Sequence, residues 1–348
     1  MSPDTRPFGL KPLLAAARAV LLPAIVLAAS APGQTPASTA ASAPTAAVDA
    51  RPSGPTFIVS DLPSARPLRI VVYGDMRFTN PSNTSDTSPG VRKWLAEKVA
   101  EEKPDLMLLT GDMPFHGGNP DDWKIYDQET AAWRAERLRV YPTIGNHEVL
   151  PTRDLGLANY FRAYPQIGNS PWYSVRLGNI YLITLDSSSF LAPGWPQREW
   201  LEAQLKQLPP DVDFVFLLFH VPMIADLQTA FMLGIPGPGG LEVRQYIEAQ
   251  AAKSHAKFVV FNGHIHNYER FELNGITHVI TGGGGAKPYP VFLRGDQDLF
   301  RAHTYPNFNY VLITLKGKHA DAKMYRVADP YSSEMHTELK DSFTLDAR

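Results

Sequence analysis

The sequence of 348 residues contains no cysteine. Disulfide bridges, thiolate zinc sites and cysteine nucleophiles are therefore excluded. The sequence also lacks an excess of either charge, since 33 Lys and Arg stand against 35 Asp and Glu, and no basic block stands out. A nucleic-acid partner is therefore not expected. With 44% hydrophobic and 20% charged residues, the composition is that of an ordinary globular protein.

A hydrophobic run long enough to cross a membrane comfortably is missing from the N-terminal region. The apolar run at residues 19–29 is short and is interrupted by a proline. Three basic residues precede it, and a small-x-small cleavage pattern follows at residues 29–31. These features predict a secretory signal peptide over residues 1–31, and the alternative is a short membrane anchor. We expect an exported protein, periplasmic or secreted, with no membrane attachment after cleavage.

Residues 32–55 are rich in Ala, Pro, Ser and Thr. A segment of this composition cannot bury enough apolar surface to order itself, so it predicts a disordered linker. The remaining residues 56–348 are enough for one domain of the α/β or sandwich type.

Short apolar runs bounded by turn residues have the pattern of strands that are covered on both faces. Helical patterns lie between them at residues 91–102, 197–208 and 241–253, and residues 171–187 predict a hairpin. This alternation predicts an α/β fold with a largely buried mixed sheet. The five runs occupy residues 68–75, 106–112, 140–148, 214–220 and 258–264.

Each of these runs ends in a side chain with an oxygen or an imidazole nitrogen, and a glycine immediately precedes four of the ends. Ligands of open α/β sheets bind outside the carboxyl ends of the strands, so these side chains are expected to gather in one cluster. Glycine lets the backbone turn sharply there. The residues at the five ends are Asp75, Asp112, Asn146 with His147, His220, and His264 with His266.

The cluster combines two carboxylates, one amide and several imidazoles without a thiolate. Such mixed ligands suit Zn, Fe or Mn, and their number exceeds what one four-coordinate ion needs. A pair of ions about 3.5–4 Å apart is a recurrent device for hydrolysing phosphate esters. The alternative is that each residue is an isolated cap or loop residue, but the coincidence of five strand ends favours a dinuclear metal centre.

The motifs GDMR, GDMPF, GNHE, FHVP and GHIHNYER, in this order, resemble those of the calcineurin-like metallophosphoesterase superfamily. GNHE and GHIHNYER resemble its purple-acid-phosphatase branch. The resemblance covers residues 68–315 and implies a four-layer αββα sandwich of two mixed β-sheets flanked by helices. It also implies a hydrolase that acts on small phosphate esters by attack of a metal-bound hydroxide, with phosphomonoesters favoured. The alternatives are a phosphodiesterase of the same fold and a catalytically weak protein that binds metal or phosphate.

The resemblance also implies how the side chains share two ions, which would be divalent or trivalent Fe, Zn or Mn. Asp112 would bridge the two ions, and Asp75 and His266 would bind the first. The second ion would also be bound by Asn146, His220 and His264.

Two further residues receive catalytic roles from the resemblance. His147 would contact the phosphate and protonate the leaving oxygen, and Glu148 would orient His147.

Two positions depart from the family pattern. Members commonly complete the first site with a histidine two residues after the first aspartate, which is Asp75 here, or with a tyrosine three residues after the second, which is Asp112. This chain has Arg77 and Phe115 at these two positions. Neither side chain can ligate a cation, so the first site keeps three protein ligands and water, and a purple colour is not expected. Arg77 is expected to bind the substrate phosphate, and the alternative is an ion pair with Asp75.

His116 is expected to be a plain loop residue, and the alternative is that it binds metal or contacts the phosphate.

Two glycine-rich segments leave alternatives open. Residues 281–288 have a proline where a nucleotide-binding loop would need Ser or Thr, so they predict a tight turn at the rim of the cleft. Residues 225–240, which follow His220, are either a substrate lid or a packed connection.

Overall fold

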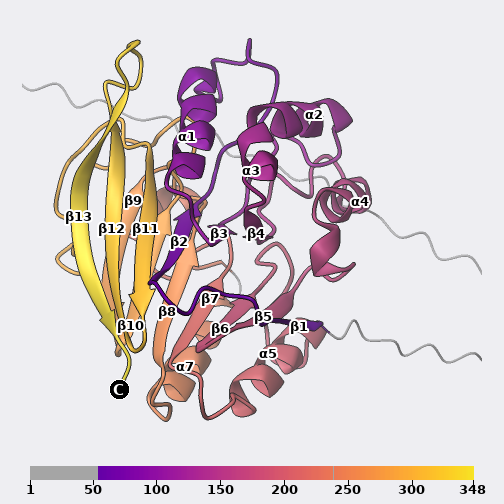
Figure 1. The fold of residues 1–348 in the computed structure, drawn as a ribbon, viewed down its shortest axis with the longest axis vertical. Coiled ribbons are helices and arrows are strands. Elements are labelled where there is room, and N and C mark those ends of the chain that lie inside the picture. Colours follow the sequence, from indigo (N-terminus) through magenta and orange to yellow (C-terminus); the bar gives the residue numbers. More distant parts are fainter. Residues whose placement is uncertain (1–53, 238) are drawn as a thin grey trace, which may run out of the picture. The chain divides into compact units, whose positions relative to one another are not determined.

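The computed structural model describes residues 54–237 and 239–348 (Figure 1). The expected signal peptide, residues 1–31, and all but the end of the expected linker, residues 32–55, lie outside the described residues. Within the described ranges, none of the helices combines the length and the apolar character that a bilayer-spanning segment needs.

Two mixed β-sheets form the centre of the domain. The seven-stranded sheet has the order β1-β5-β6-β7-β8-β10-β9, and the six-stranded sheet has the order β13-β12-β11-β2-β3-β4. The first has a parallel centre, β6-β7-β8-β10, between antiparallel neighbours. In the second, the parallel strands β2-β3-β4 form one side up to the edge strand β4, and β2 pairs antiparallel with β11 on the other side. The strands are β1 (Thr56–Val59), β2 (Leu68–Tyr73), β3 (Leu106–Leu109), β4 (Arg139–Pro142), β5 (Tyr173–Leu177), β6 (Ile180–Thr184), β7 (Phe214–Leu218), β8 (Lys257–Asn262), β9 (Tyr268–Leu273), β10 (Ile276–Thr281), β11 (Asn309–Lys316), β12 (His319–Ala328) and β13 (His336–Asp346).

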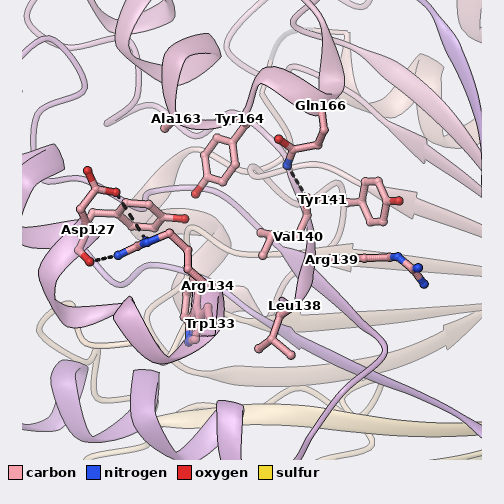
Figure 2. A pocket seen from close by; sticks show the side chains of 11 residues that line it. Asp127, Trp133, Arg134, Leu138, Arg139, Val140, Tyr141, Ala163, Tyr164 and Gln166 are labelled. Carbon is pink, nitrogen blue, oxygen red and sulfur yellow. Dashed lines mark hydrogen bonds and ion pairs between the residues drawn. The ribbon is translucent and has the colours of Figure 1, made fainter. Parts of the chain in front are cut away.

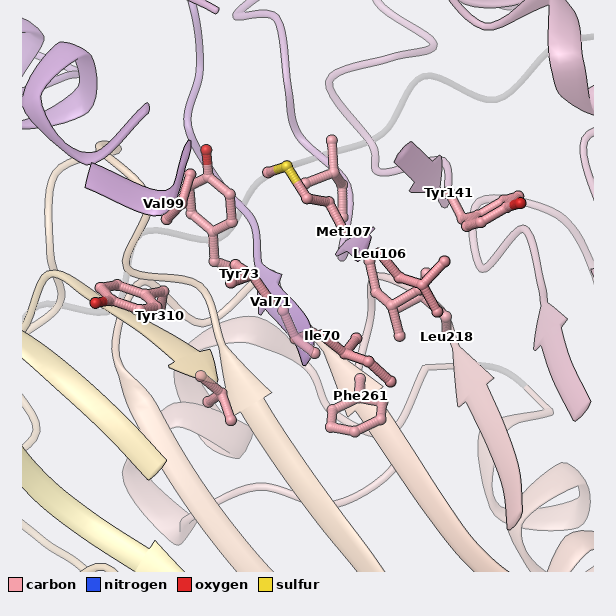
Figure 3. Close-up of a cluster of buried hydrophobic side chains, with 14 of the residues drawn as sticks. Ile70, Val71, Tyr73, Val99, Leu106, Met107, Tyr141, Leu218, Phe261 and Tyr310 are labelled. Atoms are coloured by element: carbon pink, nitrogen blue, oxygen red, sulfur yellow. The ribbon is translucent and has the colours of Figure 1, made fainter. Parts of the chain in front are cut away.

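The two sheets share one apolar core. Ile70 of β2 and Leu106 of β3 belong to the same buried cluster as Leu218 of β7 and Phe261 of β8, and Figure 3 shows these side chains meeting between the sheets. All four are completely buried. Because each such side chain stabilises the fold by about 1.5–3 kcal/mol when it leaves water, this interface fixes the two sheets against each other.

Helices cover the outer faces of the sheets (Figure 1). Val91 and Leu95 of α1 join the core at the six-stranded sheet, whereas Leu201 of α5 and Val243 of α7 pack on the seven-stranded sheet in a second cluster. The predicted four-layer sandwich of two mixed sheets is therefore confirmed. The helices are α1 (Pro89–Glu101), α2 (Pro120–Glu129), α3 (Ala131–Ala135), α4 (Arg153–Ala163), the 3₁₀ helix η1 (Pro165–Ile167), α5 (Pro196–Lys206), α6 (Leu227–Leu233) and α7 (Gly240–Ala251).

Residues 140–148 were expected to form a strand, but the strand β4 ends at Pro142. The chain then continues into the loop that carries Asn146. The segment at residues 225–240 contains α6, whose Ala230 and Leu233 pack on a small apolar cluster that includes Ile265. The helix α6 therefore packs on the domain through one of its faces.

A buried ion pair joins α1 to α2. The Arg92 side chain is completely buried and donates to both carboxylate oxygens of Glu129, at 2.8 and 2.6 Å. It also donates to the carbonyl oxygens of Arg77 (3.0 Å) and Thr79 (3.1 Å), so it fixes the loop after β2.

We predict that Arg92→Met lowers the free energy of unfolding by about 3–5 kcal/mol, because Glu129 and two carbonyl groups lose their buried partner. Urea unfolding followed by circular dichroism measures this change. Lys93→Ala, at the neighbouring exposed position of the same helix, is the control and should change the stability by no more than about 0.5 kcal/mol. A stability of Arg92→Met equal to that of the control would contradict the role of this pair.

Candidate metal centre

The loops that follow parallel strands of both sheets meet at one place. Asp75 follows β2, Asp112 follows β3 and Asn146 follows β4, while His220 and His264 follow β7 and β8. The structure brings these side chains together with His266, as their hydrogen bonds and short contacts show. All six side chains expected to ligate metal therefore lie in one cluster.

The expected second site has the spacing of a ligand shell. His220 Nε2 lies 3.4 Å from Asp112 Oδ1, 3.0 Å from Asn146 Oδ1 and 3.2 Å from His264 Nδ1. His264 Nδ1 lies 3.2 Å from Asn146 Oδ1. Four ligand atoms arranged tetrahedrally at about 2.1 Å from an ion would be about 3.4 Å apart, which agrees with these distances. The donor set therefore fits a metal ion.

The expected first site is a looser group of three residues. One ligand atom each of Asp75, Asp112 and His266 lies within 4.8 Å of the other two, and all three residues are buried. His266 Nε2 is 3.5 Å from Asp75 Oδ1, and it is buried without a hydrogen-bond partner. An orphaned imidazole nitrogen beside two carboxylates is the arrangement that a bound cation would satisfy.

Backbone carbonyl groups orient two of the imidazoles. His220 Nδ1 lies 2.9 Å from the carbonyl oxygen of Thr110, and His266 Nδ1 lies 2.7 Å from that of Lys287. A carbonyl oxygen only accepts, so each Nδ1 carries the proton and each Nε2 keeps its lone pair for the cluster.

The surroundings hold the imidazoles in the neutral form that a metal ion requires. Burial lowers the pKa of His220, and burial together with the neighbouring His220 lowers the pKa of His264 to about 3. Burial and the Arg77 guanidinium lower the pKa of His266 well below its usual range.

The two carboxylates behave as an unequal pair. Burial and the adjacent Asp112 raise the pKa of Asp75 well above its usual value. Although burial opposes it, the imidazoles of His220 and His147 together with Arg77 lower the pKa of Asp112. The two shifts have opposite directions, and Asp112 lies in the position expected to bridge two ions.

The turns after the strands have unusual backbone geometry. Asp75, Arg77, Asp112 and His264 have φ angles of 59°, 52°, 56° and 69°. Such left-handed conformations cost non-glycine residues roughly 1–3 kcal/mol each, and they cluster at functional sites. Space is equally constrained, because a Cβ on Gly263 would lie 2.4 Å from Asp75 Oδ2. The backbone is thus bent to bring ligand side chains inward.

The expectation that Glu148 orients His147 is corrected. The His147 ring is positioned by the Phe115 carbonyl oxygen, 2.5 Å from Nδ1. The buried Glu148 carboxylate instead accepts from the backbone N–H groups of Asp112 (2.9 Å), Met113 (2.6 Å) and Gly145 (2.6 Å). Burial and the nearby Asp112 raise the pKa of Glu148 to about 8. Glu148 therefore ties together the loops after β3 and β4.

His147 lies at the edge of the cluster. Its backbone N–H donates to Asp112 Oδ1 at 2.9 Å, and its ring Nε2 lies 3.9 Å from Asp112 Oδ2. Burial lowers the pKa of His147. With Nδ1 occupied by a carbonyl group, Nε2 is the atom available to a substrate.

Arg77 also reaches the cluster. Its Nη2 lies 3.2 Å from Asp112 Oδ2, and its side chain is 14% exposed. Its partner is thus Asp112 rather than the alternative Asp75. The Arg77 Nε is buried and has no hydrogen-bond partner.

Two aromatic neighbours complete the surroundings. The His116 ring packs edge-on against Phe115 at a centroid distance of 4.5 Å and lies 6.4 Å from the His147 ring. Sequence reasoning missed Tyr289, whose ring is stacked on His266 at 4.3 Å with an interplanar angle of 14°. The glycine-rich turn before Tyr289 hydrogen-bonds to the loop after β2, through Ala286 N–H and the Asp75 carbonyl oxygen (2.8 Å).

A cavity of about 400 Å³ lies elsewhere, between α2, α3, β4 and α4 (Figure 2). None of the candidate metal ligands lines it. Two of its polar side chains are paired, since Gln166 donates to the Val140 carbonyl oxygen at 2.9 Å and Arg134 pairs with Asp127 at 3.5 Å. The Tyr164 hydroxyl is buried there without a hydrogen-bond partner, but the cavity lacks the group of converging carboxylates and imidazoles that distinguishes the cluster.

Comparison with known proteins places the same residues in a family context. The family model described as calcineurin-like phosphoesterase matches residues 68–268, which is more than half of the chain. The chain is 27% identical over 214 residues to a phosphoenolpyruvate phosphatase of Allium cepa, covering 56% of this chain and 42% of that protein. It is 25% identical over 240 residues to the Fe(3+)-Zn(2+) purple acid phosphatase 12 of Arabidopsis thaliana, covering 62% of this chain and 46% of that protein.

A solved structure extends the similarity to the fold. The purple acid phosphatase PPD1 from yellow lupin (Lupinus luteus) seeds superimposes with a TM-score of 0.61 at 19% identity, covering 80% of this chain and 54% of that one. The chain spans less than half the length of the two curated relatives above. The matched segment contains every residue of the cluster, and the chain belongs to the calcineurin-like phosphoesterase family.

Proposed function

We propose that the protein is a metal-dependent phosphoesterase that hydrolyses phosphate esters, with phosphomonoesters favoured. The observation that carries the proposal is the second site, where four nitrogen and oxygen donor atoms from four loops converge at 3.0–3.4 Å contacts. Family membership supports it, as do the relatives that are named phosphatases.

Asn146, His220 and His264 would hold one ion, Asp75 and His266 the other, and Asp112 would contact both. Such ions supply Lewis-acid polarisation of a phosphoryl oxygen and a water molecule of lowered pKa. The mixed nitrogen and oxygen donors suit Fe, Zn or Mn.

Two side chains of the cluster would act on the substrate directly. The Arg77 guanidinium, which has an unpaired Nε, would bind equatorial phosphate oxygens and neutralise their charge. The protonated His147 ring would donate from Nε2 to the departing alkoxide, while the Phe115 carbonyl oxygen holds its other nitrogen. Because burial lowers the pKa of His147, its protonated form is a stronger acid than an exposed histidine.

Export is part of the proposal. It rests on the basic residues, apolar run and cleavage pattern within residues 1–31. The substrate would therefore be an ester met in the periplasm or outside the cell.

One observation favours a second candidate, a catalytically weak protein that binds metal or phosphate. Arg77 and Phe115 stand where relatives of this family commonly have ligands, and Arg77 pairs with Asp112, the carboxylate expected to be shared. Two equivalents of metal with turnover of p-nitrophenyl phosphate would favour the enzyme. One equivalent or none, without turnover, would favour the binding protein.

We predict that His264→Ala and Asn146→Ala each lower kcat/KM for p-nitrophenyl phosphate by at least about 100-fold, since even outer-shell partners of metal ligands contribute 10–100-fold. Elemental analysis should show a loss of bound metal while circular dichroism shows a retained fold. His255→Ala, at an exposed histidine, is the matched control. Full activity of either ligand variant would refute the assignment.

We predict that Arg77→Ala lowers kcat/KM by about 10–100-fold, the worth of a charge-assisted hydrogen bond of roughly 1.5–3 kcal/mol. The affinity for inorganic phosphate, measured by competitive inhibition, should fall in parallel while the metal content stays the same. Arg66→Ala removes an exposed arginine and serves as the control. If the metal content and the activity rise instead, Arg77 occupies space that an ion would take, and the phosphate-binding role is wrong.

A further inference from the structure

Beside the candidate metal centre lies an exposed apolar surface, here called the apolar wall. It consists of Leu227, Phe231 and Met232 of α6 together with Phe292 and Leu293 of the segment after Tyr289. Their exposed fractions are 76%, 89%, 51%, 70% and 65%. Large apolar side chains gathered on one surface commonly mark a binding site.

Hydrogen bonds through one side chain hold the two segments of the apolar wall together. Gln228 Oε1 accepts from the backbone N–H groups of Phe292 (2.9 Å) and Leu293 (3.1 Å). Gln228 Nε2 donates to the Pro290 carbonyl oxygen at 2.7 Å. The exposed side chains therefore form one fixed surface rather than two independent loops.

A buried polar scaffold supports the apolar wall from below. The Asp226 N–H and the Thr229 hydroxyl donate to the Glu269 carboxylate, both at 2.8 Å. Asp226 Oδ1 accepts from the Gly295 N–H at 2.7 Å, and Arg294 pairs with Asp298. These bonds anchor the start of α6 and the segment after Leu293 to β9, so the surface is preorganised for a ligand.

Both segments of the apolar wall are connected to the candidate metal centre. Tyr289 stacks on His266, and its N–H donates to the His266 carbonyl oxygen at 2.9 Å. Phe292 follows only three residues later. The opposite face of α6 packs on Ile265, which lies between the two ligand histidines. Both segments of the apolar wall are thus joined directly to the chain segment that carries the two ligand histidines.

We propose that the apolar wall binds the organic group of the substrate, and that the substrate is a phosphate monoester of a large apolar alcohol. The inference rests on the proposed function. None of the five side chains of the wall is charged, and the side chain of the adjacent Arg294 is 2% exposed and paired, so a charged alcohol would find no charged partner there. In the reaction a water oxygen bonds to phosphorus, the bond from phosphorus to the ester oxygen breaks, and a proton passes to the departing alcohol.

The test compares octyl phosphate with ethyl phosphate, two alkyl esters of similar intrinsic reactivity, in the metal-loaded protein. We expect kcat/KM for octyl phosphate to exceed that for ethyl phosphate by at least about tenfold, since burying two methylene groups supplies that factor. In the double variant Phe231→Ser/Phe292→Ser the octyl-to-ethyl ratio should fall about tenfold. Leu339→Ser removes a leucine of similar size that is 51% exposed on β13, and it should leave the ratio unchanged.

Hydrolysis of p-nitrophenyl phosphate with no preference for octyl phosphate would overturn the inference and leave the proposed function standing. No hydrolysis of any ester by the metal-loaded protein would overturn both. A third outcome would also overturn the inference: the protein sediments with phosphatidylcholine vesicles, or forms a dimer in sedimentation velocity, and the double variant abolishes this while the octyl-to-ethyl ratio stays unchanged. The apolar wall would then dock on a membrane or on a second copy of the chain.

Discussion

Two carboxylates, Asp75 and Asp112, are completely buried within one cluster whose imidazoles are kept neutral. Burying like charges together is strongly unfavourable unless cations compensate for them. Arg77 supplies one positive charge and contacts Asp112 alone. The raised pKa of Asp75 reflects its burial and the positive charge that is missing beside it, and this deficit, together with the orphaned Nε2 of His266, is the constraint from which the proposed metal centre follows.

The rest of the fold serves this arrangement. Parallel strands of both sheets end at the cluster, so β2, β3, β4, β7 and β8 each deliver a ligand from a fixed apolar support. Glu148 ties the loops after β3 and β4 through three backbone amides, and the Thr110 and Lys287 carbonyl groups set the tautomers of two histidines. The strained φ angles at the ligand-bearing turns are held by these bonds rather than by local preference. Stability of the sandwich and geometry of the centre therefore depend on the same contacts.

Apolar runs and the residues that follow them were enough to predict an α/β fold and the ligand cluster, whereas the sandwich of two sheets was implied by the resemblance to the family's motifs. Parallel strands are buried on both faces, which makes them visible in the sequence, and their carboxyl ends share one edge. β13 was missed because its residues are mostly polar and partly exposed, and it forms through pairing with β12. Tyr289 and the partners of Glu148 were missed because they depend on loop contacts and backbone atoms, which no motif encodes.

The most direct measurement is an anomalous-difference map from a crystal of the purified protein, recorded above and below the absorption edge of the metal that elemental analysis identifies. The account predicts one strong peak between Asn146, His220, His264 and Asp112, and a second beside Asp75 and His266. A map without a peak among these side chains, from protein that still hydrolyses phosphate esters, would contradict it.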